Sequence, residues 1–220
     1  MDASSSMLPK ILLWAGPVLV AVILHEIAHG YVAYRLGDST AAEAGRLTLN
    51  PIAHIDLFGT IIMPLLLIMS GAPFLFGYAK PVPVNFLNLR HPRRDMVLVA
   101  FAGPGMNLLL AGLAALVLHV FLLPVAQTVT DGVAALALIA GIRILYLFVL
   151  MNVGLAVFNM LPLPPLDGGR VAVGLLPRGA ALALARLEPY GMLIILLLVM
   201  SGKLGVVLQP VTALLLNLLL

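Results

Sequence analysis

The stretch Leu24-His25-Glu26-Ile27-Ala28-His29-Gly30 contains an H-E-x-x-H motif. Residues four apart share one face of a helix, so His25 and His29 can present two imidazole nitrogens to one metal ion. Glu26 is displaced from His25 by about 100° around the helix, which suits holding a water beside the metal better than ligating it. The motif is therefore typical of a zinc hydrolase with two His ligands, a Glu general base and a metal-activated water.

The segment around this motif is strongly apolar, because Ile11 to Leu24 contains no charged residue. Each ionisable group inside a membrane costs roughly 2–3 kcal/mol or more unless something compensates it. The alternative reading is that the histidines are satisfied core residues. Two His and one Glu in such a segment favour a functional site over that reading.

The composition indicates a polytopic membrane protein. Of 220 residues, 62% are hydrophobic and only 10% are charged, whereas a soluble domain has roughly 25% charged residues. The net charge of +3 is better read as a topology signal than as a sign of nucleic-acid binding. Cysteine is absent, which excludes disulfides and thiolate metal sites. No A-x-A-like cleavage site follows the first apolar segment, so we expect a retained helix and no signal peptide.

Three clear spans are predicted, at about Leu8 to Leu36, Met96 to Leu123 and Val133 to Met160. The apolar stretches Tyr190 to Met200 and Leu204 to Leu220 can also span, the first if it starts near Ala180. We therefore expect an all-α polytopic membrane protein with four to five spanning helices. Residues 1–220 would form a single domain, with a catalytic core at about 8–175 and C-terminal helices at about 180–220.

A short β or re-entrant insertion is expected between the first two spans. Gly45 to Pro51 alternates like a short strand before a turn. Leu57 to Ala79 is apolar, but glycines and prolines leave no run long enough for an ordinary spanning helix of ~20 residues. Lys80 to Asn85 is predicted to be extended, because its prolines disfavour helix.

Asp167 is the best candidate for a third metal ligand. A catalytic zinc site has three protein ligands and an open position. Asp167 follows an apolar span in a turn rich in Pro and Gly, which can aim its carboxylate inward. The alternative is that it caps a helix beginning at Gly168.

Two motifs together resemble the site-2 protease family of intramembrane zinc metalloproteases. HEIAHG lies in one span, and the run from Asn159 to Gly168 matches N-x-x-P-x-x-x-L-D-G at the end of a later one. The resemblance implies one Zn²⁺ per chain on His25, His29 and Asp167, with Glu26 as catalytic base. Asn159 would position substrate or steady the oxyanion. Its alternative role is to satisfy a free carbonyl at the helix end.

The resemblance covers roughly residues 8 to 175. It is closest to the branch that carries HIDxxGT and KPVPV segments, here His54 to Thr60 and Lys80 to Val84. Larger members carry a PDZ or CBS domain, for which these 220 residues have no room. We expect a multi-pass protein of a prokaryotic cell membrane.

The topology follows from placing Asp167 beside the H-E-x-x-H motif. With three clear spans, both reach one membrane face only if Leu57 to Ala79 dips in and returns without crossing. The positive-inside rule makes that face cytoplasmic, because it then collects most basic residues and leaves Lys10 and Lys203 opposite. The basic residues expected on the cytoplasmic face are Arg35, Arg46, Lys80, Arg90, Arg93, Arg94, Arg170, Arg178 and Arg186.

The expected reaction is hydrolysis of peptide bonds within or beside a transmembrane helix of a membrane-protein substrate. The partners are that substrate and the lipid bilayer, with no nucleic acid. Because a helical peptide bond is already hydrogen-bonded, the substrate must unwind, and an exposed strand edge can pair with it. Asn50 to Gly59 and Lys80 to Asn85 are the candidates for that edge, unless they are only structured loops.

Two other functions fit part of the pattern. One is a different H-E-x-x-H membrane protease with a Glu third ligand, for which the sequence offers Glu43 and Glu188. The other is a membrane protein that binds or transports zinc without hydrolysis. A transporter needs polar residues across the membrane, and the outer halves of the spans offer little besides Arg143.

Several polar residues have open roles. His54 and Asp56 follow a turn and favour an interfacial structural role over zinc binding. Gly103-Pro104 and Asn107 favour helix packing, with lining of the active-site cavity as a second explanation. Arg143 can snorkel or pair with an acid, for which Asp131 and Glu188 are candidates.

Overall fold

The structure is a computed structural model that describes residues 7–70, 77–129 and 131–220, with side chains from residue 16 onward. Within these ranges the chain is helical and forms no β-strand. The α-helices are α1 (Met7–Arg35), α2 (Thr40–Glu43), α3 (Met63–Met69), α4 (Pro92–Val117), α5 (Leu123–Ala126), α6 (Gly132–Asn159), α7 (Asp167–Leu175), α8 (Arg178–Ala185), α9 (Glu188–Met200) and α10 (Lys203–Leu219). The 3₁₀ turns are η2 (Pro51–His54) and η4 (Phe86–Asn88), and the π-helical segments are η3 (Leu57–Ile62) and η5 (Leu118–Leu122).

Three helical stretches in the described residues are long and apolar enough to cross a membrane. They are Gly16–Arg35, Pro92–Ala126 and Gly132–Asn159, which confirms the three clear spans. Helices α8 and α9 make a fourth candidate if this pair, bent by 65°, counts as one span. Helix α10, with 17 residues, is shorter than these candidates. The described residues therefore give three or up to four spans, where the sequence predicts four to five.

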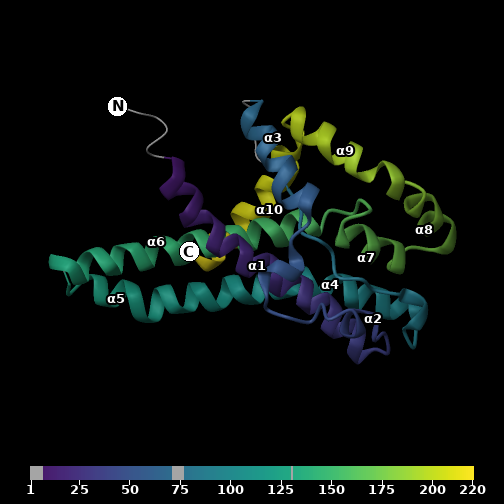
Figure 1. The fold of residues 1–220 in the computed structure, drawn as a ribbon, viewed down its shortest axis with the longest axis horizontal. Coiled ribbons are helices and arrows are strands. Elements are labelled where there is room, and N and C mark those ends of the chain that lie inside the picture. The colour runs from purple at the N-terminus through teal and green to yellow at the C-terminus, as the bar shows by residue number, and fades with distance from the viewer. Residues whose placement is uncertain (1–6, 71–76, 130) are drawn as a thin grey trace.

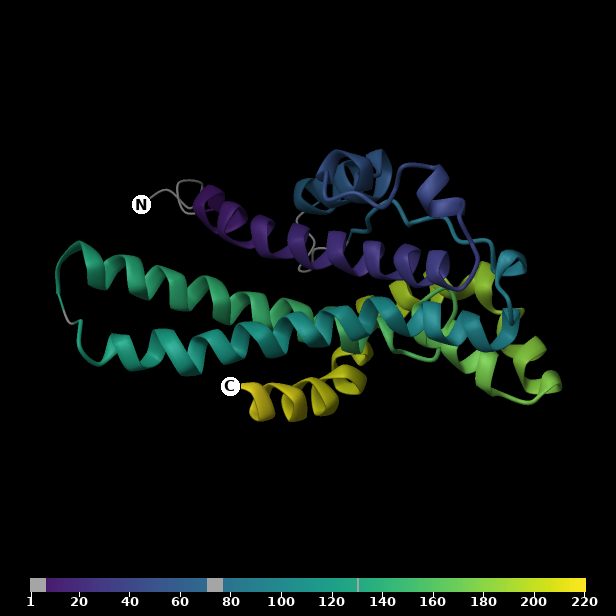
Figure 2. The same cartoon turned by 90° about the horizontal axis from the view of Figure 1, so that it is seen from below.

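The core of the bundle is an antiparallel pair formed by α4 and α6, with α1 lying along α4 (Figure 2). The contact between α4 and α6 uses small side chains, which let two helices approach closely in a membrane. In the hydrophobic cluster that both helices share, α4 contributes alanines and α6 contributes valines, and Ala111 and Val149 in this cluster are both 0% exposed. The packing of α4 on α6 therefore brings residues that are far apart in the sequence to the same depth of the bundle.

The outer surface of the bundle is apolar. Large side chains such as Leu113, Phe121 and Leu136 are 52%, 59% and 69% exposed. A soluble protein does not expose large contiguous apolar patches without a partner. Lipid tails satisfy such a surface, so the fold is that of an integral membrane protein.

The insertion between the first two spans is helical, and the predicted strand at Gly45 to Pro51 is wrong. The polar groups of this stretch bond to side chains and to the next turn: the Thr48 carbonyl accepts from His54 Nε2 at 2.8 Å, and the Asn50 side chain caps η2. Lys80 to Asn85 lacks regular secondary structure, as expected of an extended segment, and it pairs with no strand.

The chain returns to the place from which the insertion leaves. The Tyr78 amide donates to the Gly59 carbonyl at 3.1 Å, and the Lys80 amide donates to the His54 carbonyl at 2.9 Å. Helix η3 continues directly into α3, which points away from the long helices (Figure 1). Part of the predicted Leu57 to Ala79 segment, residues 71–76, lies outside the described residues.

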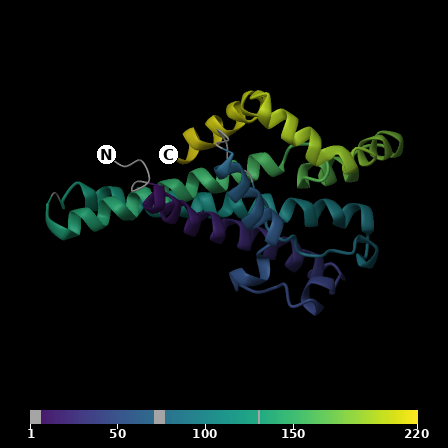
Figure 3. The ribbon, with the colours of Figure 1, turned by 45° about the horizontal axis from the view of Figure 1, so that its top comes forward.

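The C-terminal helices cover the opposite side of the bundle. Helices α9 and α10 lie on one side of the layer formed by α1, α4 and α6, while α2 lies on the other (Figure 3). Helix α9 approaches the turn before α7 closely, since a Cβ on Gly191 would come within 1.8 Å of the Pro164 carbonyl oxygen. This contact supports the turn that carries Asp167.

Candidate metal centre and catalytic cavity

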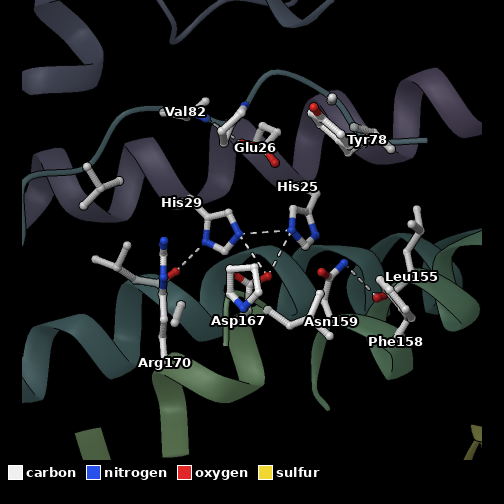
Figure 4. Close-up of a pocket in the computed structure, with 18 of the residues that line it drawn as sticks. His25, Glu26, His29, Tyr78, Val82, Leu155, Phe158, Asn159, Asp167 and Arg170 are labelled. Atoms are coloured by element: carbon white, nitrogen blue, oxygen red, sulfur yellow. Dashed lines mark hydrogen bonds and ion pairs between the residues drawn. The ribbon is translucent and has the colours of Figure 1, made fainter. Parts of the chain in front are cut away.

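His25, His29 and Asp167 meet at one point between α1 and the start of α7 (Figure 4). Asp167 Oδ2 lies 3.2 Å from His25 Nε2 and 3.3 Å from His29 Nε2. The two Nε2 atoms are 3.0 Å apart. In the described part of the chain no other group of three or more His, Cys, Asp or Glu residues could hold a metal ion. The structure therefore brings together the three residues that the sequence predicts as ligands.

The hydrogen-bond partners of the imidazoles show which nitrogens face the site. His25 Nδ1 lies 2.5 Å from Asn107 Oδ1, and His29 Nδ1 lies 2.6 Å from the Val99 carbonyl oxygen. Each oxygen can only accept a hydrogen bond, so each Nδ1 is assigned the proton that it donates. In the neutral rings both Nε2 atoms therefore present lone pairs. Two lone pairs and a carboxylate oxygen converge, an arrangement that a bound cation stabilises.

The spacing of these three donors fits zinc. Tetrahedral bonds of 2.0–2.1 Å place neighbouring ligand atoms ~3.3 Å apart, close to the observed 3.0–3.3 Å. Both ring orientations are fixed by second hydrogen bonds, as is usual for metal-binding histidines. A group of two imidazoles and one carboxylate is also a common ligand set of catalytic zinc.

Helix α4 forms the wall behind the two histidines. A Cβ on Gly103 would lie 2.3 Å from His29 Nε2 and 2.6 Å from His25 Nε2. Gly103 therefore serves the site directly, and helix packing alone does not explain it. The same is true of Asn107, which contacts a metal ligand and is completely buried.

Asp167 is positioned by a tight turn between α6 and α7. The capping alternative placed Asp167 before a helix beginning at Gly168. Helix α7 instead begins at Asp167 itself, with Leu166 at the N-cap position, and the Asp167 carboxylate faces the histidines. The next two residues must be glycine: a Cβ on Gly168 would lie 2.3 Å from the Met160 carbonyl, and one on Gly169 would lie 2.2 Å from Pro164 N.

Glu26 and the extended segment both line a cavity of about 620 Å³, which the three ligands also line. The Val82 amide donates to Glu26 Oε2 at 2.7 Å. Figure 4 shows Val82 beside Glu26, on the side of the imidazoles away from Asp167. The carboxylate is thus held in the cavity by a backbone group of the segment from Lys80 to Asn85.

Asn159 also lines this cavity, at the last turn of α6. Its Nδ2 donates to the Leu155 carbonyl, one turn earlier in α6, at 3.1 Å. A primary amide has two N–H groups, so this bond leaves a second donor for a ligand.

The remaining polar residues lie outside the metal centre. His54 is buried with its Nε2 bonded to Thr48, and Asp56 caps η3 by accepting from the Gly59 amide at 2.7 Å. Glu188 lies 3.9 Å from Arg170 and forms its ion pair there. The side chain of Arg143 is exposed on α6 and forms no ion pair with an acid among the described residues.

Sequence reasoning missed Asn152, a fully buried amide on α6. Its signal was the cost of an amide in an apolar span.

Comparisons with known proteins agree with this geometry. The family model of peptidase family M50 matches residues 14–201. The protein named "Putative zinc metalloprotease YwhC" of Bacillus subtilis is 40% identical over 196 residues, 88% of this chain and 82% of that protein. The proteins named "Putative zinc metalloprotease Rip2" of Mycolicibacterium smegmatis and Mycobacterium tuberculosis are each 31% identical over 85% of this chain and 66% of their own length. No solved structure matches the chain significantly.

The helical membrane fold and the site of two histidines and one aspartate define a membrane metalloenzyme. The chain belongs to peptidase family M50, the site-2 protease family of intramembrane zinc metalloproteases.

Proposed function

We propose that His25, His29 and Asp167 hold one zinc ion, that Glu26 is the general base, and that the protein cleaves membrane-protein substrates within the bilayer. The observation that carries this proposal is the convergence of three ligand atoms from two separate motifs within 3.0–3.3 Å. Glu26 lines the same cavity, as a base acting on a water at that point must.

The chain's own residues supply the proton transfers and the orientation of the substrate. A bound zinc ion supplies Lewis acidity, which polarises the peptide carbonyl and makes water a better nucleophile. Glu26 accepts a proton as the water oxygen bonds to the carbonyl carbon, and it gives that proton to the leaving nitrogen as the C–N bond breaks. We expect the second N–H of Asn159, which lines the same cavity, to donate to the developing oxyanion.

The extended segment is the surface on which we expect an unwound substrate to lie. Lys80 to Asn85 carries no strand partner, and it runs along the cavity that holds Glu26. Main-chain pairing would hold a substrate whatever its sequence, as in other cases of strand addition. Of the two candidate edges, Asn50 to Gly59 is the weaker, because it forms η2 and part of η3.

We place the active site toward the cytoplasm and read the insertion as re-entrant. Its two ends adjoin at the bonds between Tyr78 and Gly59, which is the geometry of a segment that leaves and returns at one depth. Hydrogen bonds of two basic residues support the placement of the end of α1, the start of α4 and α7 at one end of the bundle. The Arg90 amide donates to the Leu36 carbonyl, and the Arg93 side chain donates to the Gly174 carbonyl. Under the positive-inside rule that end is cytoplasmic.

The zinc content of purified protein tests the metal site without a substrate. We expect about one zinc per wild-type chain and a large loss in both His25→Ala and Asp167→Ala. Zinc lost in His25→Ala but retained in Asp167→Ala would remove Asp167 as a ligand and support a protease with another third ligand. Neither Glu43, which accepts from Ser39, nor Glu188 lies at the site.

Glu26→Gln separates the protease from a protein that only binds or transports zinc. The substitution keeps the shape of the side chain and removes its basicity, so we expect full zinc content with proteolysis reduced by roughly 10²–10⁴-fold. A wild type that transports zinc without any proteolysis, and a Glu26→Gln variant that transports it equally well, would favour the non-hydrolytic function. Mixed-micelle cleavage of a single-span substrate is the measurement.

A further inference from the structure

Three buried side chains form a hydrogen-bonded chain that ends at a metal ligand. Asn152 on α6 lies 2.9 Å from Asn107 on α4, and Asn107 lies 2.5 Å from His25 on α1. Asn107 and Asn152 are both 0% exposed, and His25 is 7% exposed. Two amides buried in an apolar bundle are costly unless every bond is satisfied, so their presence calls for a function.

The orientation of both amides is fixed by backbone carbonyls, which can only accept. Asn152 Nδ2 donates to the Phe148 carbonyl at 2.8 Å, which turns Asn152 Oδ1 toward α4. Asn107 Nδ2 donates to that oxygen and to the Ala21 carbonyl at 3.2 Å. Asn107 Oδ1 is therefore the atom that faces His25 Nδ1.

We propose that Asn107 and Asn152 are positioning residues that hold His25 in its metal-binding tautomer. Because Asn107 presents an oxygen, His25 must carry its proton on Nδ1, which leaves the Nε2 lone pair for zinc. A flipped Asn107 amide would present N–H groups to Nδ1 and place the proton on Nε2, where it blocks ligation. Asn152 opposes that flip, because the flip would bring Asn107 Oδ1 against Asn152 Oδ1, and neither oxygen can donate a hydrogen bond.

The role differs from that of the Val99 carbonyl, which orients His29 through the main chain and cannot be removed by mutation. Only the His25 side of the site depends on side chains. The role assigned to Asn107 and Asn152 rests on the metal site proposed above, and zinc binding by the wild type is the first arm of its test. A wild type without zinc would overturn the metal site itself.

The decisive measurement is the zinc dissociation constant, obtained by competition with a chromophoric chelator. Asn107→Leu removes the acceptor, and we expect zinc affinity to fall roughly 10–100-fold, the usual range for loss of such a partner. Asn152→Leu should lower it less. The double variant should be no worse than Asn107→Leu, because Asn152 acts only through Asn107. Equal affinity in Asn107→Leu and wild type would overturn the proposal, and additive losses would overturn the role of Asn152.

Asn107→Asp separates positioning from stability. The introduced carboxylate would keep an acceptor for His25 but set its second oxygen against the Ala21 carbonyl and Asn152 Oδ1. We therefore expect near-normal zinc affinity in a less thermally stable metal-free protein. Val153→Ala, in the adjacent and equally buried position of α6, should lower stability without changing zinc affinity. Zinc affinity that simply follows thermal stability across all variants would mean a structural role only.

The absorption spectrum of the cobalt-substituted protein gives a readout that is independent of activity. Cobalt(II) reports the geometry of its ligands through its visible bands. We expect Asn107→Leu to alter these bands and Asn107→Asp and Val153→Ala to retain them. An unaltered spectrum in Asn107→Leu would show that His25 holds its orientation without Asn107.

Discussion

Gly103 is placed where any side chain would meet two metal ligands. Changing Gly103 to Ala would bring a Cβ within 2.3 Å of His29 Nε2 and 2.6 Å of His25 Nε2. If either ring moved, it would lose its Nδ1 hydrogen bond or turn its Nε2 atom away from the metal site. We expect zinc affinity to fall at least about tenfold, measured as bound zinc after dialysis.

Gly112 provides the matched control on the same helix. Nothing lies within 4 Å of a Cβ built there, so Gly112→Ala should keep full zinc content. If both variants lose zinc alike, the effect belongs to α4 as a whole and not to the contact between Gly103 and the histidines.

Asp38 predicts how stability depends on pH. It is fully buried and accepts bonds from Thr40, Asn85 and Asn88, which join the end of α1 to the end of the extended segment. Burial opposes its charge, but these hydrogen bonds outweigh burial and hold the pKa of Asp38 below its usual range.

A carboxyl whose pKa is lower in the folded state stabilises the fold above its unfolded pKa of about 3.9, and the effect is lost as pH falls through the folded value. We expect the melting temperature to drop on acidification below about pH 5, and Asp38→Asn to be less stable by about 1–3 kcal/mol at neutral pH, with a flatter acid limb. Asp131→Asn, at an exposed position, serves as control. Identical pH profiles for wild type and Asp38→Asn would contradict this assignment.

At the scale of elements, the extended segment and α1 are joined at the catalytic carboxylate. Val82→Pro removes the amide that donates to Glu26 Oε2, while Val82→Thr keeps both the amide and the shape of the side chain. A hydrogen bond to a charged group contributes about 1.5–3 kcal/mol, so we expect roughly 10–100-fold slower cleavage by Val82→Pro. Zinc content should be normal in both variants.

Cleavage by Val82→Pro at the wild-type rate would show that Glu26 acts without this donor. A rate loss shared by Val82→Thr would instead assign the effect to packing, because Val82 is also buried against Gly30.

The elements that could be predicted from sequence are those set by local patterns. Spans follow from long apolar runs, and the pairing of His25 with His29 follows from helical spacing. The strand at Gly45 to Pro51 failed because alternation alone supplies no partner. The polar contacts of Asn152, the Val99 carbonyl and the Val82 amide could not be predicted, since they depend on which helix faces which.

For the whole molecule, the proposed topology can be tested with single cysteines, because the chain has none of its own. Glu43, Arg94 and Gln127 are exposed and flank the first two long helical spans. If the insertion is re-entrant, Glu43→Cys and Arg94→Cys share the cytoplasmic side and resist a membrane-impermeant thiol reagent in intact cells. Gln127→Cys should react without permeabilisation.

A full crossing by residues 57–79 would give the opposite pattern for one of the first two sites. Glu43→Cys and Arg94→Cys would then differ in intact cells. Labelling of all three after permeabilisation confirms that each cysteine is reactive.

The metal centre draws on α1, α4, α6 and α7, and this has a consequence for biosynthesis. His25 is made long before Asp167, and at roughly 5–20 residues per second the ribosome needs roughly 7–28 s to travel from one to the other. Until α7 has been made and packs, the nascent chain contains the general base Glu26 but lacks the third metal ligand, Asp167. A protease that is inserted into a membrane containing its own potential substrates is therefore inactive through most of its synthesis.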